Sequence, residues 1–319
     1  MKTNLLTVGI TLGSGLLVSL TPTALAVEGA LGRPISGTTI MPYAGVVPPM
    51  PGFAFGAGET YYSGSISGNR TIPVAQNLTL GIDLKASFTP VSALYIWDTG
   101  TNSSWNFASA VSLPIAWLEA EANVTLGPRT GHVKDSTFGL FDIAFVPITA
   151  SYHLSPTEHL ALSFTVWAPT GEYDQNKLAN LSMNTWTLIP GVAYTKIFPE
   201  VNIELSVSWA MTFDTENPAT DYQNGILSDL ELLTVKRFKC GAGVGVIGSW
   251  IEQLTDDEGT TADTLNGFKG RAFGIGPVVT YSTHLGKHDL EFNARWVHEF
   301  DNKNYVEGDV FMLNATLKF

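Results

Sequence analysis

Apolar and polar residues alternate along much of the chain, which is the pattern of a β-strand with two unlike faces. The clearest case is 201–213, where every odd position is apolar and the even positions carry Asn, Glu, Ser, Ala and Thr. The same period recurs in 160–167, in 289–296 and in the last nine residues, 311–319. A helix would place these residues on mixed faces. The pattern therefore predicts strands that each have one apolar face.

Twelve segments show strand patterns of this kind, and each is at least about as long as the roughly 9 to 11 residues of a tilted strand that crosses a bilayer. They cover 53–65, 80–97, 105–124, 137–153, 158–168, 184–196, 200–213, 226–238, 241–253, 270–282, 287–299 and 308–319. Breaks between them alternate from short to long, as in barrels with short turns at one end and long loops at the other. The sequence predicts an all-β fold, a transmembrane antiparallel up-and-down β-barrel of about 12 strands over 53–319, with both termini in the periplasm.

Aromatic residues support this topology because it places them near strand ends, where membrane barrels carry aromatic girdles. Those expected near the outer ends are Trp167, Trp186, Phe213, Trp250, Phe273, Trp296 and Phe311. Those expected near the inner ends are Tyr152, Tyr194, Tyr281 and Phe319. A soluble twelve-stranded sandwich or barrel, the alternative fold, would bury its tryptophans instead.

Composition narrows the class of protein. Only 14% of the 319 residues are charged, against roughly 25% in soluble domains, and the net charge of -12 argues against a nucleic-acid partner. A single cysteine, Cys240, excludes an internal disulfide and zinc or iron–sulfur sites built from several cysteines. We therefore predict no cofactor and no metal.

The N-terminal region is expected to hold two segments. Residues 1–26 have a signal-peptide pattern, with Lys2, an apolar stretch over 5–20 and a small-residue cleavage site ending at Ala26. Residues 27–52 are rich in Pro and Gly, so neither a ladder strand nor a regular helix is expected there. This segment either folds into the lumen as a plug or forms a periplasmic tail. If it is a plug, the residues that face a substrate path are Ile40, Met41, Tyr43, Val46, Val47 and Met50.

Polar residues opposite the apolar strand faces are the candidates for lining the lumen and setting its selectivity. They are Asp142, Glu204, Asp229, Glu231, Asp289, Glu291, Asn293 and Arg295. An acidic lumen should disfavour anions if it conducts. We expect Arg295 to pair with Glu291 or with a cross-strand carboxylate such as Asp142, since an unpaired charge in a narrow lumen is costly.

Several stretches between residue 139 and the end of the chain resemble a known family. The most specific are Gly-Leu-Phe-Asp-Ile at 139–143, Trp-Ala-Pro-Thr-Gly-Glu-Tyr-Asp at 167–174 and Asn-Thr-Trp-Thr at 184–187. Further matches cover 214–222, 253–257, 267–271, 276–277 and 295–296. The chain resembles the family of outer-membrane proteins named after the MetA pathway of phenol degradation. This family is similar to barrels that act as channels for hydrophobic compounds.

The resemblance implies passive uptake of small hydrophobic, including aromatic, compounds across the outer membrane of a Gram-negative bacterium. The implied partners are outer-membrane lipid, lipopolysaccharide and a small hydrophobic ligand; the oligomeric state stays open. The alternative is a structural or surface-interaction outer-membrane barrel with a plugged lumen. An enzyme is not predicted, because the chain has neither a Gly-x-Ser-x-Gly elbow nor a His-Glu-x-x-His motif.

Overall fold

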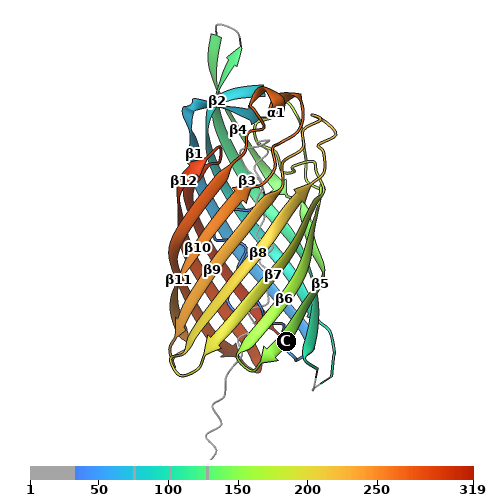
Figure 1. Cartoon of the computed structure of the whole chain (residues 1–319), viewed down its shortest axis with the longest axis vertical. Helices are drawn as coiled ribbons and strands as arrows, with labels where there is room; N and C mark the ends of the chain where they lie inside the picture. Colours follow the sequence, from blue (N-terminus) through green and yellow to red (C-terminus); the bar gives the residue numbers. More distant parts are fainter. Residues whose placement is uncertain (1–32, 75–76, 101–102, 127–128) are drawn as a thin grey trace, which may run out of the picture.

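The computed structural model describes residues 33–74, 77–100, 103–126 and 129–319, which form a β-barrel (Figure 1). Its strands are β1 (Gly52–Val74), β2 (Asn77–Ile96), β3 (Trp105–Leu126), β4 (Arg129–Leu140), β5 (Ile143–Ser155), β6 (Glu158–Ala168), β7 (Thr187–Phe198), β8 (Ile203–Asp214), β9 (Leu227–Arg237), β10 (Ala242–Gln253), β11 (Arg271–Leu285), β12 (His288–Lys303) and β13 (Glu307–Lys318). The expected signal peptide, 1–26, and the start of the next segment lie outside the described residues.

Among the described residues, twelve of these strands close the ring, each antiparallel to its neighbours, and pairing of β1 with β13 completes it. This confirms the predicted barrel and strand number. The remaining strand, β4, pairs with the second half of β3 and forms a hairpin that extends beyond the barrel (Figure 1).

The expected continuous strand 137–153 is wrong, because the chain leaves the strand conformation at Phe141 and Asp142. At this point β3 changes its partner from β5 to β4. Pro114 of β3 lies at the change, where it has no N–H to donate to a neighbouring strand. The break turns Asp142 into the barrel, where it is fully buried.

The two ends of the barrel differ. The short turns 156–157, 199–202, 238–241 and 286–287 lie at one end together with the C-terminus, which we call the C-terminal rim. The longer connections 169–186, 215–226 and 254–270 lie at the other end, the loop rim, and the last of them contains the short helix α1 (Thr260–Thr264). No helix in the described ranges has the length and apolar character needed to cross a membrane.

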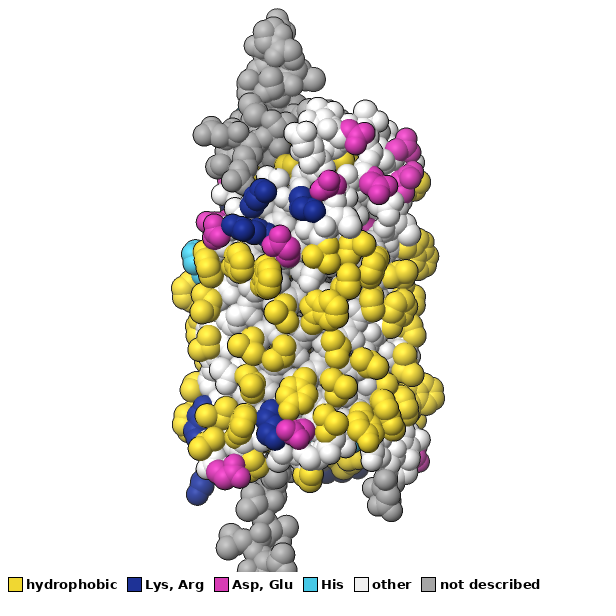
Figure 2. Space-filling view, in the orientation of Figure 1, with side chains coloured by type: hydrophobic (Ala, Val, Ile, Leu, Met, Phe, Trp, Pro, Cys, Tyr) yellow, Lys and Arg dark blue, Asp and Glu magenta, His cyan; other side chains and the backbone are white. Residues whose placement is uncertain are grey.

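Figure 2 shows a broad band of apolar side chains between the rims on one face, and exposed apolar side chains occur on strands all around the barrel. Trp209, Val279 and Leu313 expose 44%, 53% and 55% of their surfaces, whereas the inward neighbour Glu204 exposes only 2%. This reversal of the usual burial is that of a lipid-facing barrel wall. Trp167 does not belong to the band: it points inward beside Phe141, so its expected place in an outer girdle is wrong.

Asp257 organises the connection between β10 and β11. Its carboxylate, 3% exposed, accepts hydrogen bonds from the hydroxyl of Tyr222 and, at 2.7 Å each, from the N–H of Gly225 and the side-chain amide of Gln253. Burial raises the pKa of Asp257 to about 6, although the hydrogen bonds act in the opposite direction. The loop therefore holds the protonated acid more strongly than an unfolded segment does.

This pKa predicts a pH-dependent loop. An unfolded aspartate releases its proton near pH ~3.9, so loop stability should fall as pH rises from about 4 to about 6, by up to roughly 3 kcal/mol. Hydrogen exchange at residues 222–225 and 253–257, corrected for intrinsic rates, should be faster at pH 7 than at pH 5. Asp257→Asn should remove the difference, because an amide does not titrate. Equal pH dependence in both proteins would contradict the assignment.

Candidate functional site

The lumen contains part of the chain's own N-terminal region, residues 33–48, which we call the luminal segment. It forms no strand; some of its hydrogen bonds lie within the segment, and others go to side chains of the barrel wall. Five of the six expected plug residues are at least nine-tenths buried there: Ile40, Met41, Tyr43, Val46 and Val47. The prediction for Met50 is wrong, because this side chain is 57% exposed and follows the point where the segment leaves the interior.

Two carboxylates of β9 bind the middle of the luminal segment. Glu231 accepts the backbone N–H groups of Thr39 at 3.3 Å and of Ile40 at 2.6 Å. Asp229 accepts the hydroxyl of Thr39 at 2.8 Å. Both carboxylates are almost completely buried. They satisfy polar groups of a segment that has no strand neighbour, since buried N–H groups without acceptors are costly.

A second contact fixes the segment at Tyr43. Glu204 of β8 accepts the N–H of Tyr43 and forms an ion pair with Arg237 of β9 at 2.7 Å. The Arg237 guanidinium lies 4.4 Å from the centre of the Tyr43 ring, a cation–π contact. Tyr43 has a φ of 59°, in the left-handed region that non-glycine residues avoid. These surrounding contacts stabilise that conformation.

Arg295 of β12 provides the complementary donor. The expected pairing with Glu291 or Asp142 is wrong: the guanidinium donates to the backbone oxygens of Gly37 at 2.8 Å and Ile40 at 2.7 Å. The sequence pattern could not reveal these acceptors, because they belong to a segment more than 250 residues away. Arg295 thus binds the segment's carbonyl groups, while Glu231 binds its N–H groups.

Asp142 connects three parts of the molecule. Its carboxylate pairs with Arg33 of the luminal segment at 2.9 Å. It also accepts the N–H groups of Thr170 and Gly171 at 3.0 Å each and of Met183 at 3.2 Å. Asp142 therefore fastens both the luminal segment and the connection 169–186 to the barrel wall. Arg33 was not among the expected functional residues.

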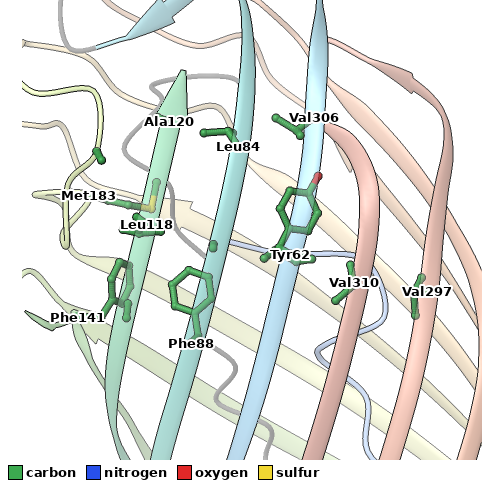
Figure 3. Close-up of a cluster of buried hydrophobic side chains, with 14 of the residues drawn as sticks. Tyr62, Leu84, Phe88, Leu118, Ala120, Phe141, Met183, Val297, Val306 and Val310 are labelled. Atoms are coloured by element: carbon green, nitrogen blue, oxygen red, sulfur yellow. The ribbon is translucent and has the colours of Figure 1, made fainter. Parts of the chain in front are cut away.

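A cluster of buried apolar side chains lies inside the barrel, and Figure 3 shows part of it. The cluster includes Tyr62, Leu84, Phe88, Leu118, Phe141, Met183, Val297, Val306 and Val310. Sequence reasoning missed it because it assigned the polar face of every strand to the lumen. In β2 and β3 that assignment is inverted near the hairpin: Lys85 and Glu119 form an exterior ion pair at 3.5 Å, while Leu84 and Leu118 point inward.

The remaining expected site residues lie in the half of the lumen that is nearer the C-terminal rim. Glu291 and Asn293 line a cavity of about 20 Å³ below Met41 and Pro42 of the luminal segment. Asp289 lies closer to the rim, where it interacts with His284 at 2.8 Å. Within the described ranges, no group of three or more His, Cys, Asp or Glu side chains is arranged to hold a metal ion.

A match to a family model decides the family of this barrel. The family described as "Putative MetA-pathway of phenol degradation" matches residues 55–315. The chain belongs to this family. The match confirms the resemblance found in the motifs after residue 139 and extends it through β1–β3. A search of curated proteins finds no match.

Several solved structures align with this chain at low sequence identity. An outer membrane channel from Pseudomonas putida F1 aligns with a TM-score of 0.66 and 13% identity, over 86% of this chain and 97% of that one. The β domain of the Bordetella autotransporter BrkA aligns with a TM-score of 0.47 and 13% identity, over 83% of this chain and 99% of that one. A Pseudomonas aeruginosa FadL homologue aligns with a TM-score of 0.44 and 8% identity, over 93% of this chain and 97% of that one. The first of these supports the barrel fold of this chain.

Proposed function

We propose that this protein is an outer-membrane channel for passive uptake of small hydrophobic compounds, including aromatic ones, and that the luminal segment is its plug. The observation that carries the proposal is the lumen itself. A transmembrane barrel encloses a cluster of apolar side chains together with a segment of the chain that belongs to no strand. The description of the Pseudomonas putida F1 structure as an outer membrane channel agrees with it.

The way in which the luminal segment is bound supports a removable plug. Its contacts with Glu231, Glu204 and Arg295 are hydrogen bonds to side chains, so the segment can leave without breaking any pairing between barrel strands. A segment that formed part of the wall could not do so. The anchors determine how often the lumen opens, and the apolar cluster presents a hydrophobic surface to the compound that enters.

The orientation follows the usual arrangement of outer-membrane barrels, with short turns and both termini toward the periplasm. The C-terminal rim then faces the periplasm and the loop rim faces outward, among lipopolysaccharide headgroups. A hydrophobic compound would enter at the loop rim, pass the apolar cluster and leave beside the displaced luminal segment.

A second candidate is a structural or surface-interaction barrel whose lumen stays plugged. The close filling of the lumen favours this candidate, because the cavity below Met41 and Pro42 has room for only about one water molecule. Its loops, such as the one ordered by Asp257, would then be the functional surface.

Uptake measurements separate the two candidates. Cells that produce the protein should take up labelled toluene faster than cells without it, while uptake of benzoate, an anion of similar size, should change little. A toluene rate that does not depend on the protein, together with cell adhesion that is lost when residues 254–270 are shortened, would support the structural candidate and contradict the channel.

A further inference from the structure

We propose that the polar cavity between the luminal segment and the barrel wall binds the hydroxyl group of a small phenol, and that hydroxylated aromatic compounds bind there before they are released. This inference deepens the proposed function and rests on it. The cavity lies between Met41 and Pro42 on one side and the inner faces of β9 and β11–β13 on the other.

Three residues that line the cavity carry buried donor nitrogens without partners in the described part of the chain. They are Nε of Arg237 and the side-chain amide nitrogens of Asn293 and Asn314. Asn293 and Asn314 expose only 5% and 8% of their surfaces. Buried donors of this kind are nearly always satisfied in folded proteins. Their shared position around one cavity points to a bound acceptor.

The amide orientation of Asn293 is fixed by its neighbour. Arg295 donates its Nε–H to Oδ1 of Asn293 at 3.1 Å. A guanidinium has no acceptor atom, so the oxygen of Asn293 must face Arg295. The amide nitrogen of Asn293 is therefore the atom that can donate to a further acceptor.

Glycines on both sides make room for this polar row. Thr280, Asn293 and Asn314 are cross-strand partners in consecutive strands, followed by Gly58 on β1 and preceded by Gly243 on β10. A side chain at Gly58 would collide with Oδ1 of Asn314, and one at Gly243 would collide with Oγ1 of Thr280. The two glycines therefore leave the space that the side chains of Asn314 and Thr280 occupy.

A phenolic hydroxyl matches the chemistry of the cavity better than a carboxylate or a hydrocarbon does. The asparagine amides and Arg237 need an acceptor, whereas the Glu291 carboxylate in the same lining needs a donor and repels anions. A hydroxyl group provides both. In the described state the space holds about one water; the aromatic ring enters when Met41 and Pro42 move away with the luminal segment.

The test compares uptake of labelled phenol and toluene by cells that produce the wild-type protein, Asn293→Asp or Asn293→Leu. Asp keeps the oxygen that Arg295 contacts and removes the free donor. Leu removes the donor without adding charge, but it also removes the oxygen that accepts from Arg295. Each substitution should lower the ratio of phenol uptake to toluene uptake roughly fivefold, the effect of one hydrogen bond, and Asn293→Asp should leave toluene uptake unchanged. Asn293→Asp/Asn314→Asp should lower it further.

Ser112→Ala is the matched control. Ser112 of β3 is also buried, but it bonds with its cross-strand neighbour Ser92 and does not line the cavity, so this variant should keep the wild-type ratio of phenol to toluene. If toluene uptake depends on the protein but the Asn293 variants keep that ratio, the cavity holds only water and this inference is overturned. An equal loss for both compounds would show a purely structural role and would also overturn it. If neither compound depends on the protein, the proposed function itself fails.

Discussion

Deleting residues 27–51 while keeping the predicted signal peptide, residues 1–26, is expected to raise the ion conductance of the barrel in planar bilayers about tenfold, since a twelve-stranded barrel is wider than one that side chains alone can fill. The deletion removes the luminal segment and empties the space around Glu204, Glu231 and Arg295. The strand pairing is unaffected because the segment belongs to no strand. Conductance steps of single barrels, before and after deletion, measure the effect directly.

Weakening the anchors provides the graded control for the deletion. Glu231→Gln should leave the segment in place but loosen it, because the side-chain oxygen still accepts one of the two N–H groups that the carboxylate accepts now. This variant should show brief openings to the conductance of the deletion variant. A correctly folded deletion variant with wild-type conductance would show that the luminal segment does not close the pore.

Asp142→Ala is expected to release the connection 169–186 and the start of the luminal segment together. The substitution leaves Arg33 as a buried charge without its partner and removes the acceptor of three backbone N–H groups. Breaking one side of a buried ion pair costs about 3–5 kcal/mol. Trypsin should then cut after Lys177, which lies within this connection, faster than it does in the wild-type protein.

The double variant Arg33→Met/Asp142→Leu tests the cause of that release. It removes the isolated charge, so the luminal segment should be held more firmly than in Asp142→Ala, although the connection still lacks its acceptor. Arg33→Met alone should leave the connection ordered. Equal cleavage after Lys177 in the wild-type and Asp142→Ala proteins would contradict the role assigned to Asp142.

The barrel could be predicted from the sequence because alternation is a local property. The strand at 201–213 places Glu204 inward and Trp209 outward in the structure as the pattern requires. The inward carboxylates were likewise identifiable as candidates. Their partners were not, since Arg33 and Asp142 are 109 residues apart and Arg295 and Gly37 are 258 apart. A period in the sequence indicates a face of the barrel but contains no information on which distant segment occupies the lumen.

The predictions from sequence that the structure contradicts went wrong for local reasons. Alternation shows that a strand has two unlike faces, but near the hairpin the wall no longer borders lipid, so the polar face of β2 turns outward with Lys85. Trp167 lies near a strand end, as a girdle residue does, but it occupies one of the positions of β6 whose side chains point inward. It packs on Phe141 there, and the Arg33 guanidinium lies over its ring. Pro114 could have indicated the exchange of strand partners, because proline interrupts a ladder.

The most direct test of the channel with a removable plug is the initial rate of labelled toluene entry into intact cells at low concentration, where the lipopolysaccharide leaflet limits entry. Three strains are compared: one without the protein, one with the wild-type protein and one with the variant lacking residues 27–51. We expect the rate to rise in that order. Equal rates in the strain without the protein and the wild-type strain would contradict it.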